Sequence, residues 1–168
     1  MKAQPGTYAL MLASSTAAPL GIGKLGTLYL QPGFYVYVGS AQGPGGLRAR
    51  LAHHLEPSAH PHWHVDYLRA HTNPEEVWYC LDHRPWEHEW AQRVGMQPGA
   101  SVPLAGFGAS DCRCETHLFL FESRLSRTAF ARSLTAFGHP PLQLYRAEAV
   151  TVRARRQATT TIPVANRH

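Results

Sequence analysis

The first forty residues alternate between short apolar runs and polar or Pro-Gly breaks, a pattern typical of consecutive strands. The runs at 7–13, 24–31 and 34–39 are rich in Leu, Val and Tyr, which favour strands. Because side chains alternate across a strand, Tyr35 and Tyr37 share one face of the third run. We expect the three strands to pair in one antiparallel sheet.

Beyond a Gly-rich break the apolar spacing becomes helical, since Leu47, Leu51 and Leu55 recur every four residues. The same periodicities predict several further elements downstream. These are helices over 62–72, 84–94 and 124–137 and strands over 75–81, 116–123 and 142–152. The sequence therefore predicts an α/β fold of the α+β type, in which a small, mainly antiparallel sheet is flanked by helices.

Composition is that of one globular domain without a membrane segment. The chain has 168 residues, of which 44% are hydrophobic, and it contains no apolar run of about 18 residues. Its three cysteines, an odd number, are a poor basis for a disulfide framework. We therefore expect a cytoplasmic protein with no membrane partner, comprising a domain over 1–137 and a basic extension over 138–168.

Positive charge is concentrated near the C-terminal end. The formal net charge is +5, and residues 141–168 supply most of it through five arginines against one acid, Glu148. A basic extension on a nearly neutral domain favours a polyanionic partner, because phosphates attract cations and release counterions on binding. Arg153, Arg155 and Arg156 are the candidate contacts; a solvated end without a specific partner fits the composition equally well.

Four side chains on different predicted elements have chemistry suited to a phosphate ester. The phenols of Tyr8 and Tyr37 can meet at one end of the sheet, although packing alone also explains strand tyrosines. Arg50 lies at the edge of the leucine stripe and can present its guanidinium to phosphate, whereas Arg48 points elsewhere. Glu87 shares a helical stripe with apolar residues, where a carboxylate needs a metal ion or a salt-bridge partner.

One short segment is rich in zinc-binding groups. Cys112, Cys114 and His117 lie close together, and Cys80 could supply a fourth ligand. Their spacing differs from that of the usual zinc fingers. A loop that shapes the site beside Glu87 is the stronger interpretation.

A second segment combines His62, His64 and Asp66, which could bind a metal ion or nucleic acid. On a helix, positions 62 and 64 diverge, so joint coordination requires the first residues to be non-helical. Helix capping and packing are the alternative interpretation.

Several short sequence motifs resemble those of a known family and occur in the same order. GTYAL (6–10), YVYVGSA (35–41), LRARL (47–51) and the glutamate of WEHEWA (86–91) resemble the motifs of GIY-YIG nuclease domains. Residues 23–55, 62–68 and 106–119 are closer still to the DUF123 subfamily, and the resemblance covers roughly residues 6–122. Four features depart from the family pattern, and one of them is a longer loop between the second motif and Arg50, through GPGG (43–46). The first motif has Thr7 in place of isoleucine, Ser40 stands where many members carry lysine, and Ser110 or Asp111 would replace a downstream asparagine.

The resemblance implies a metal-dependent endonuclease that hydrolyses DNA phosphodiester bonds, in DNA repair or processing. Tyr8 would be the general base, Tyr37 would position water or phosphate, Arg50 would neutralise phosphate charge, and Glu87 would bind Mg²⁺ or Mn²⁺. The other expected nucleic-acid contacts are Gly39, Ser40, His54, His64, Arg153, Arg155 and Arg156. RNA stays open as a second substrate class.

Two other functions fit the same sequence. A nucleic-acid-binding module could keep this scaffold without catalysis, since the lysine and asparagine of other members are replaced. A zinc protein is the third interpretation, and it depends on Cys112 and Cys114. Cleavage of DNA that requires a divalent metal distinguishes the nuclease from both.

Overall fold

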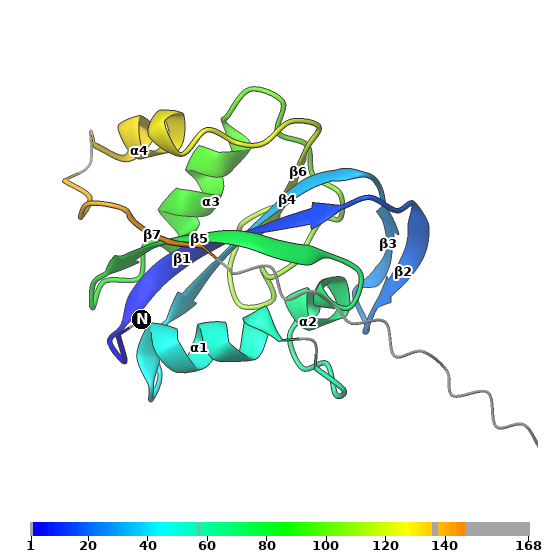
Figure 1. Cartoon of the computed structure of the whole chain (residues 1–168), viewed down its shortest axis with the longest axis horizontal. Helices are drawn as coiled ribbons and strands as arrows, with labels where there is room; N and C mark the ends of the chain where they lie inside the picture. The colour runs from blue at the N-terminus through cyan, green and yellow to red at the C-terminus, as the bar shows by residue number, and fades with distance from the viewer. Residues whose placement is uncertain (1, 57, 136–137, 147–168) are drawn as a thin grey trace, which may run out of the picture.

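Five antiparallel strands form the central sheet, in the order β6-β4-β1-β5-β7 (Figure 1). The strands are β1 (Gly6–Ser14), β4 (Gly33–Ala41), β5 (Asn73–Leu81), β6 (Leu118–Phe121) and β7 (Gln143–Arg146). The computed structural model describes residues 2–56, 58–135 and 138–146. Within these residues the predicted α+β fold, with its small antiparallel sheet, is confirmed.

The pairing predicted for residues 24–31 is wrong. β3 (Gly26–Leu30) does not join the central sheet and pairs with β2 (Ala18–Ile22) in a separate two-stranded sheet. The apolar pattern does not reveal β2, because most of this strand is exposed and it contains proline and glycine. The hairpin still contributes to the core, since Leu28 and Leu30 are buried.

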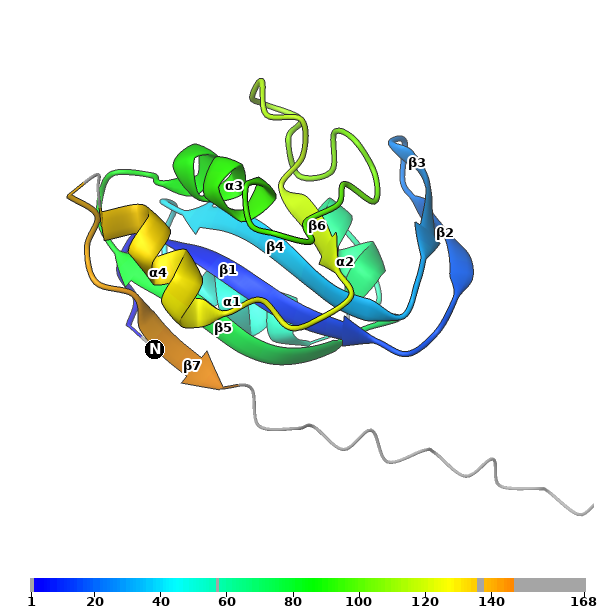
Figure 2. The ribbon, with the colours of Figure 1, turned by 90° about the horizontal axis from the view of Figure 1, so that it is seen from above.

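Helices cover both faces of the central sheet. α1 (Gly46–Leu55) and α2 (His64–Arg69) lie on one face, and α3 (Glu87–Gly95) and α4 (Arg127–Thr135) lie on the other. Figure 1 shows the sheet between the two pairs, and Figure 2 shows α3 and α4 in front of the strands with α1 and α2 behind them. The sheet therefore separates two hydrophobic cores.

The alternation of side chains along β4 distributes its residues between these cores, as predicted. Tyr35 and Tyr37 are buried with the leucines of α1, whereas Val36 and Val38 are buried with the large apolar side chains of α3 and α4. Both phenols of the strand thus face α1 and α2.

Three helices differ from the predicted ranges, and one of them, α4, begins at Arg127 and not at residue 124. α2 is shorter than 62–72, since Trp63 still has an extended backbone and the helix ends at Arg69. α3 begins after Pro85 instead of including it in the first turn, and Trp86 is its N-terminal cap. Glu87 is consequently the first residue of α3.

The C-terminal part of the described chain extends the sheet past residue 137, the predicted end of the domain. β7 covers only part of the strand predicted at 142–152, and the rest of that stretch lies outside the described residues. Arg153, Arg155 and Arg156 also lie outside them. Of the helices that the structure describes, none has the length and apolar character needed to cross a membrane.

Gly39 faces Tyr8 directly across the β1–β4 ladder. A Cβ atom at Gly39 would lie 2.6 Å from the hydroxyl oxygen of Tyr8 and 2.7 Å from its Cζ. Real Cβ atoms do not approach other heavy atoms so closely. The missing side chain therefore makes room for the Tyr8 phenol, which explains why this tyrosine-bearing strand has glycine at its end.

Replacing Gly39 by alanine is expected to lower the free energy of unfolding by about 1–3 kcal/mol, because the new methyl group overpacks the Tyr8 ring. Urea unfolding measures this change. Gly21→Ala is the matched control, since a Cβ there meets no atom within 4 Å. The double variant Gly39→Ala/Tyr8→Phe should lose less stability than the two single changes together, because it relieves the contact with the hydroxyl. Strict additivity would contradict the proposed clash.

Candidate functional site

A pocket of about 420 Å³ opens at the edge of the sheet where β4 extends beyond β6. β6 pairs only with Phe34–Tyr37, and the N–H of Val38 then donates to the carbonyl oxygen of His117 at 2.9 Å. The pocket is lined by residues from β1, β4, α1, α2, α3 and the segment 108–117. They are Tyr8, Tyr37, Gly39, Ser40, Arg50, His62, Trp63, His64, Glu87, Gly108, Ser110, Asp111 and His117. The four residues predicted to act on a phosphate ester are thus brought together.

The two phenols lie side by side in the floor of the pocket. Tyr8 and Tyr37 are 1% and 7% exposed, and their ring centroids are 6.3 Å apart. Burial raises the pKa of both phenols well above the ordinary value for tyrosine. Each phenol is therefore a neutral O–H group at neutral pH and can donate a hydrogen bond to an anion.

Arg50 supplies a fixed positive charge at the pocket wall. Its guanidinium lies over the Trp63 indole, with Cζ 4.4 Å from the ring centroid. This cation–π contact limits the freedom of the side chain. Arg48 is exposed and does not line the pocket, as the helical spacing predicts.

Glu87 reaches the same pocket from the opposite side of the sheet. The body of α3 packs its Trp90, Ala91 and Val94 into the core on the far face from the phenols. Because Glu87 is the first residue of the helix, it projects at the sheet edge, and its side chain is 19% exposed. Glu89 faces away and forms an ion pair with Arg84 at 2.7 Å.

Carboxylate and hydroxyl oxygens of the pocket provide hard ligands. Glu87, Asp111 and Ser110 all line it, and Asp111 is exposed. Such oxygens are the ligands that Mg²⁺ and Mn²⁺ prefer, usually with only one or two carboxylates from the protein. The donor set therefore fits the predicted divalent metal, with Glu87 as the residue that the sequence identifies.

His54 lies beneath the pocket and not at its surface, which corrects its predicted role as a nucleic-acid contact. The residue is fully buried. Its Nδ1 lies 3.1 Å from Oδ1 of Asp66, and its Nε2 has no hydrogen-bond partner among the described residues. The imidazole ring centroid is 6.0 Å from that of Tyr8 and 6.2 Å from that of Tyr37.

The His54–Asp66 pair has a defined protonation state. Burial lowers the pKa of His54 to about 4, although the neighbouring Asp66 opposes this shift. A neutral His54 must donate its Nδ1–H to the Asp66 carboxylate, which leaves Nε2 as a buried proton acceptor beside the phenols. The helical repeat places His54 one turn after Arg50 and near Leu51, but it does not show that this part of α1 is fully buried.

The histidine-rich segment divides between two roles. Asp66 accepts hydrogen bonds at 2.9 Å from the backbone N–H groups of His62 and Trp63, so it caps α2, as the alternative interpretation holds. Burial alone would raise the pKa of Asp66, but these bonds, together with one from His53, lower it. His62 and His64 line the pocket. Nδ1 of His64 accepts the N–H of Gly108 at 3.0 Å, which fixes the imidazole in the pocket wall.

The predicted cysteine cluster forms with a different fourth member. Cys80 is buried in β5 within the core that contains α3, away from the other two thiols. His88 of α3 instead joins Cys112, Cys114 and His117, and this set has the chemistry of a metal site.

Comparison with known proteins identifies one family. The family model described as "Domain of unknown function DUF123" matches residues 7–138. No curated protein and no solved structure matches the chain.

The free energy of unfolding is expected to fall as the pH is lowered from about 6.5 towards about 4. In this range His54 is protonated in the unfolded chain but stays neutral in the folded protein, where burial lowers its pKa. The contribution of His54 is fully present above this range, and its loss amounts to at most about 1.4 kcal/mol per pH unit. Urea unfolding across the range should show a shallower pH dependence for His54→Gln than for the wild type. Replacement of the exposed His60 by glutamine is the control. Parallel curves for wild type and His54→Gln would contradict a neutral, buried imidazole.

Proposed function

The chain belongs to the DUF123 family, and we propose that it is a metal-dependent endonuclease that hydrolyses DNA phosphodiester bonds with the site of a GIY-YIG nuclease. The observation that carries this proposal is the convergence of Tyr8, Tyr37, Arg50 and Glu87 on one pocket. These residues are far apart in the sequence and come from β1, β4, α1 and α3. Packing alone requires neither a cation nor a carboxylate at this place.

The pocket has the shape and polarity for one phosphate group of a polynucleotide. Arg50 offers paired N–H donors suited to phosphate oxygens, and its position over Trp63 limits the entropy lost on binding. The neutral phenols of Tyr8 and Tyr37 add O–H donors from the floor. Gly39 and Ser40 bring the backbone of β4 to the rim, where a strand of nucleic acid can approach closely.

Glu87, with Asp111 nearby on the pocket wall, would hold Mg²⁺ or Mn²⁺. A metal bound there would act as a Lewis acid on the phosphate and on the leaving oxygen. The protein contributes this carboxylate from the first turn of α3.

Attack by water on phosphorus requires a group that takes up a proton. A buried neutral phenol can take a proton from water only if it gives its own O–H proton to another group. We assign this acceptance to Nε2 of His54, which has no hydrogen-bond partner among the described residues and whose ring centroid lies 6.0 and 6.2 Å from those of Tyr8 and Tyr37. Because burial lowers the pKa of His54 to about 4, the imidazole is a weak base that holds the proton only transiently and returns it to solvent. The proton then moves from water to the oxygen of Tyr8, directly or through Tyr37, and the phenolic proton moves to His54.

In this step the water oxygen bonds to phosphorus while the ester P–O bond breaks, and the leaving oxygen takes a proton from solvent. Asp66 stabilises the imidazolium that forms on His54, because its carboxylate accepts the Nδ1–H. Arg50 balances the negative charge that develops on the phosphate. Tyr8 thus carries the proton, Tyr37 orients the reacting groups, and Arg50 balances the charge.

A nucleic-acid-binding module without catalysis is the second candidate. It is favoured by Ser40, which occupies the pocket rim without the positive charge that lysine would bring. It is favoured also by the raised pKa of both phenols, which makes them weak acids. The test below separates it from the nuclease.

Purified full-length protein is expected to cleave single-stranded, nicked or branched DNA in the presence of Mg²⁺ or Mn²⁺, and EDTA should abolish cleavage. Glu87→Gln, Tyr8→Phe and Arg50→Ala should each lower the single-turnover rate by about 100-fold or more, because each removes a group that acts on the transition state. Glu89→Gln and Arg48→Ala are matched controls from the same helices, and they should cleave at the wild-type rate.

Circular dichroism spectra and DNA affinity identify variants that have lost structure or binding instead of catalysis. Binding without cleavage on every DNA and RNA substrate, with either metal, would overturn the nuclease and support the binding module. A Glu87→Gln variant as active as Glu89→Gln would contradict the assigned site.

A further inference from the structure

We propose that Cys112, Cys114, His117 and His88 form a structural Zn²⁺ site that fastens the segment 112–117 to the first turn of α3. This site uses other ligands than the oxygen groups of the pocket but adjoins them, since Nε2 of His88 lies 3.5 Å from Oε1 of Glu87. The proposal does not depend on nuclease activity, since it concerns the metal content and folding of the chain.

The geometry of the four ligand atoms supports one tetrahedral ion. One atom from each of the four side chains lies within 4.8 Å of the other three. Sγ of Cys112 and Nε2 of His117 are 3.5 Å apart. Zn–S and Zn–N bonds of about 2.3 and 2.05 Å at a tetrahedral angle give an S···N separation of about 3.6 Å. This pair is therefore already spaced as two ligands of one zinc ion.

The ligand types select zinc over the harder metals. Two thiols and two imidazoles are soft or borderline donors, whereas Mg²⁺ and Mn²⁺ prefer carboxylate and water oxygens. Four protein ligands also complete the coordination of the ion, which is typical of structural rather than catalytic zinc. The structure describes no disulfide between these residues, and Cys112 and Cys114 are free thiols.

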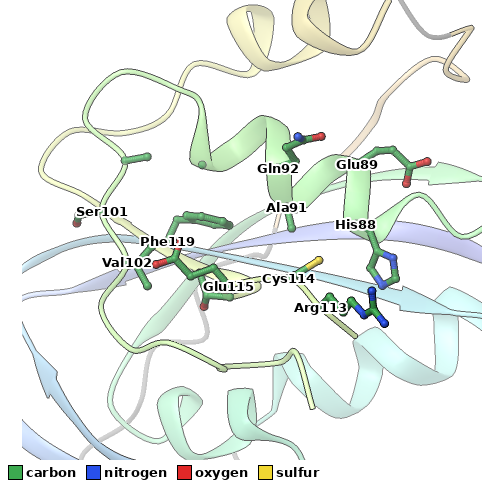
Figure 3. Close-up of a pocket in the computed structure, with 13 residues that line it drawn as sticks. His88, Glu89, Ala91, Gln92, Ser101, Val102, Arg113, Cys114, Glu115 and Phe119 are labelled. Atoms are coloured by element: carbon green, nitrogen blue, oxygen red, sulfur yellow. The ribbon is translucent and has the colours of Figure 1, made fainter. Parts of the chain in front are cut away.

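His88 is the ligand that links two distant parts of the fold. It lies in the first turn of α3, next to Glu87, whereas the other three ligands follow much later in the chain. Figure 3 shows His88 extending from α3 towards the segment that carries Arg113 and Cys114, beside a pocket of about 690 Å³. Cysteine spacing alone could not reveal this partner.

The middle of the segment 108–117 has fewer restraints than its ends. The segment contains no helix and no strand, yet Gly108, Ser110, Asp111 and His117 line the pocket. Its ends are held by hydrogen bonds from the N–H of Gly108 to Nδ1 of His64 and from the N–H of Val38 to the carbonyl oxygen of His117. Zinc would fix the middle of this wall against the helix that presents Glu87.

A second group of possible ligands, His53, His54 and Asp66, does not offer the same opportunity. Asp66 already accepts four hydrogen bonds, from both imidazoles and from two backbone N–H groups. An ion there would displace the cap of α2. Within the described residues, the cysteine cluster has weaker contacts, at 3.5 Å from Sγ of Cys112 to Nε2 of His117 and at 3.5 Å from Nε2 of His88 to Oε1 of Glu87.

The test measures metal content of the full-length protein, purified under reducing conditions without chelators or added metal. Elemental analysis is expected to find one zinc per chain. Cys112→Ser and Cys114→Ser should lose at least nine-tenths of it, and folded His88→Ala should bind zinc at least tenfold more weakly in competition with a chromogenic chelator. Cys80→Ala and His83→Ala are controls that remove a thiol and an exposed imidazole outside the cluster, and both should keep the metal.

Cobalt substitution identifies the ligands directly. Co²⁺-loaded wild type should show thiolate-to-metal charge transfer and the intense visible bands of tetrahedral coordination, and each serine variant should lose most of this absorption, because it loses most of its metal. Reduced wild-type protein that takes up no zinc would overturn the proposal. Zinc retained by the Cys112→Ser/Cys114→Ser double variant, or unchanged affinity in folded His88→Ala, would overturn it equally.

Discussion

The packing of the Tyr8 phenol against Gly39, across the β1–β4 ladder, is the contact on which the pocket depends. Only a residue without a side chain leaves space there for the hydroxyl of Tyr8. The same register brings the Tyr8 ring beside that of Tyr37 and places both on the face covered by α1. A slip of one residue between these two strands would turn one phenol to the other face and separate it from its partner. Gly39 therefore provides the space in which the Tyr8 phenol packs beside Tyr37.

The chemistry of the site follows from how its parts are solvated. The phenols and His54 are deeply buried and neutral, because burial opposes their charged forms. Charge lies at the more accessible walls, on Arg50 over Trp63, on Glu87 at the start of α3 and on the exposed Asp111. Asp66 holds the buried imidazole in one tautomer. The pocket therefore combines a buried proton acceptor, Nε2 of His54, with more accessible charges. An anionic ligand can reach the guanidinium of Arg50, and a cation can reach the carboxylate of Glu87.

Much of this arrangement could be predicted from the sequence, because the strands and helices that carry it have strong periodicity. The strand period of two residues predicts the face on which Tyr37 lies. The helical period of 3.6 residues favours Arg50 over Arg48 and predicts the inward position of Glu87. Three features could not be predicted in this way. β2 is mostly exposed and carries no alternation, His54 resembles a surface residue until the burial of α1 is known, and His88 meets the cysteines only through the tertiary fold. The last two depend on packing between segments far apart in the chain, which local patterns do not encode.

The central claim is that one pocket holds a phosphate between Arg50 and the phenols with a divalent metal on Glu87. Crystals grown with a phosphorothioate oligonucleotide, which resists hydrolysis, and Mn²⁺ test it most directly through anomalous scattering. The account predicts an anomalous peak bonded to the Glu87 carboxylate, with the modified phosphate in contact with Arg50, Tyr8 and Tyr37. A phosphate bound elsewhere on the surface, or manganese that never contacts Glu87, would contradict it.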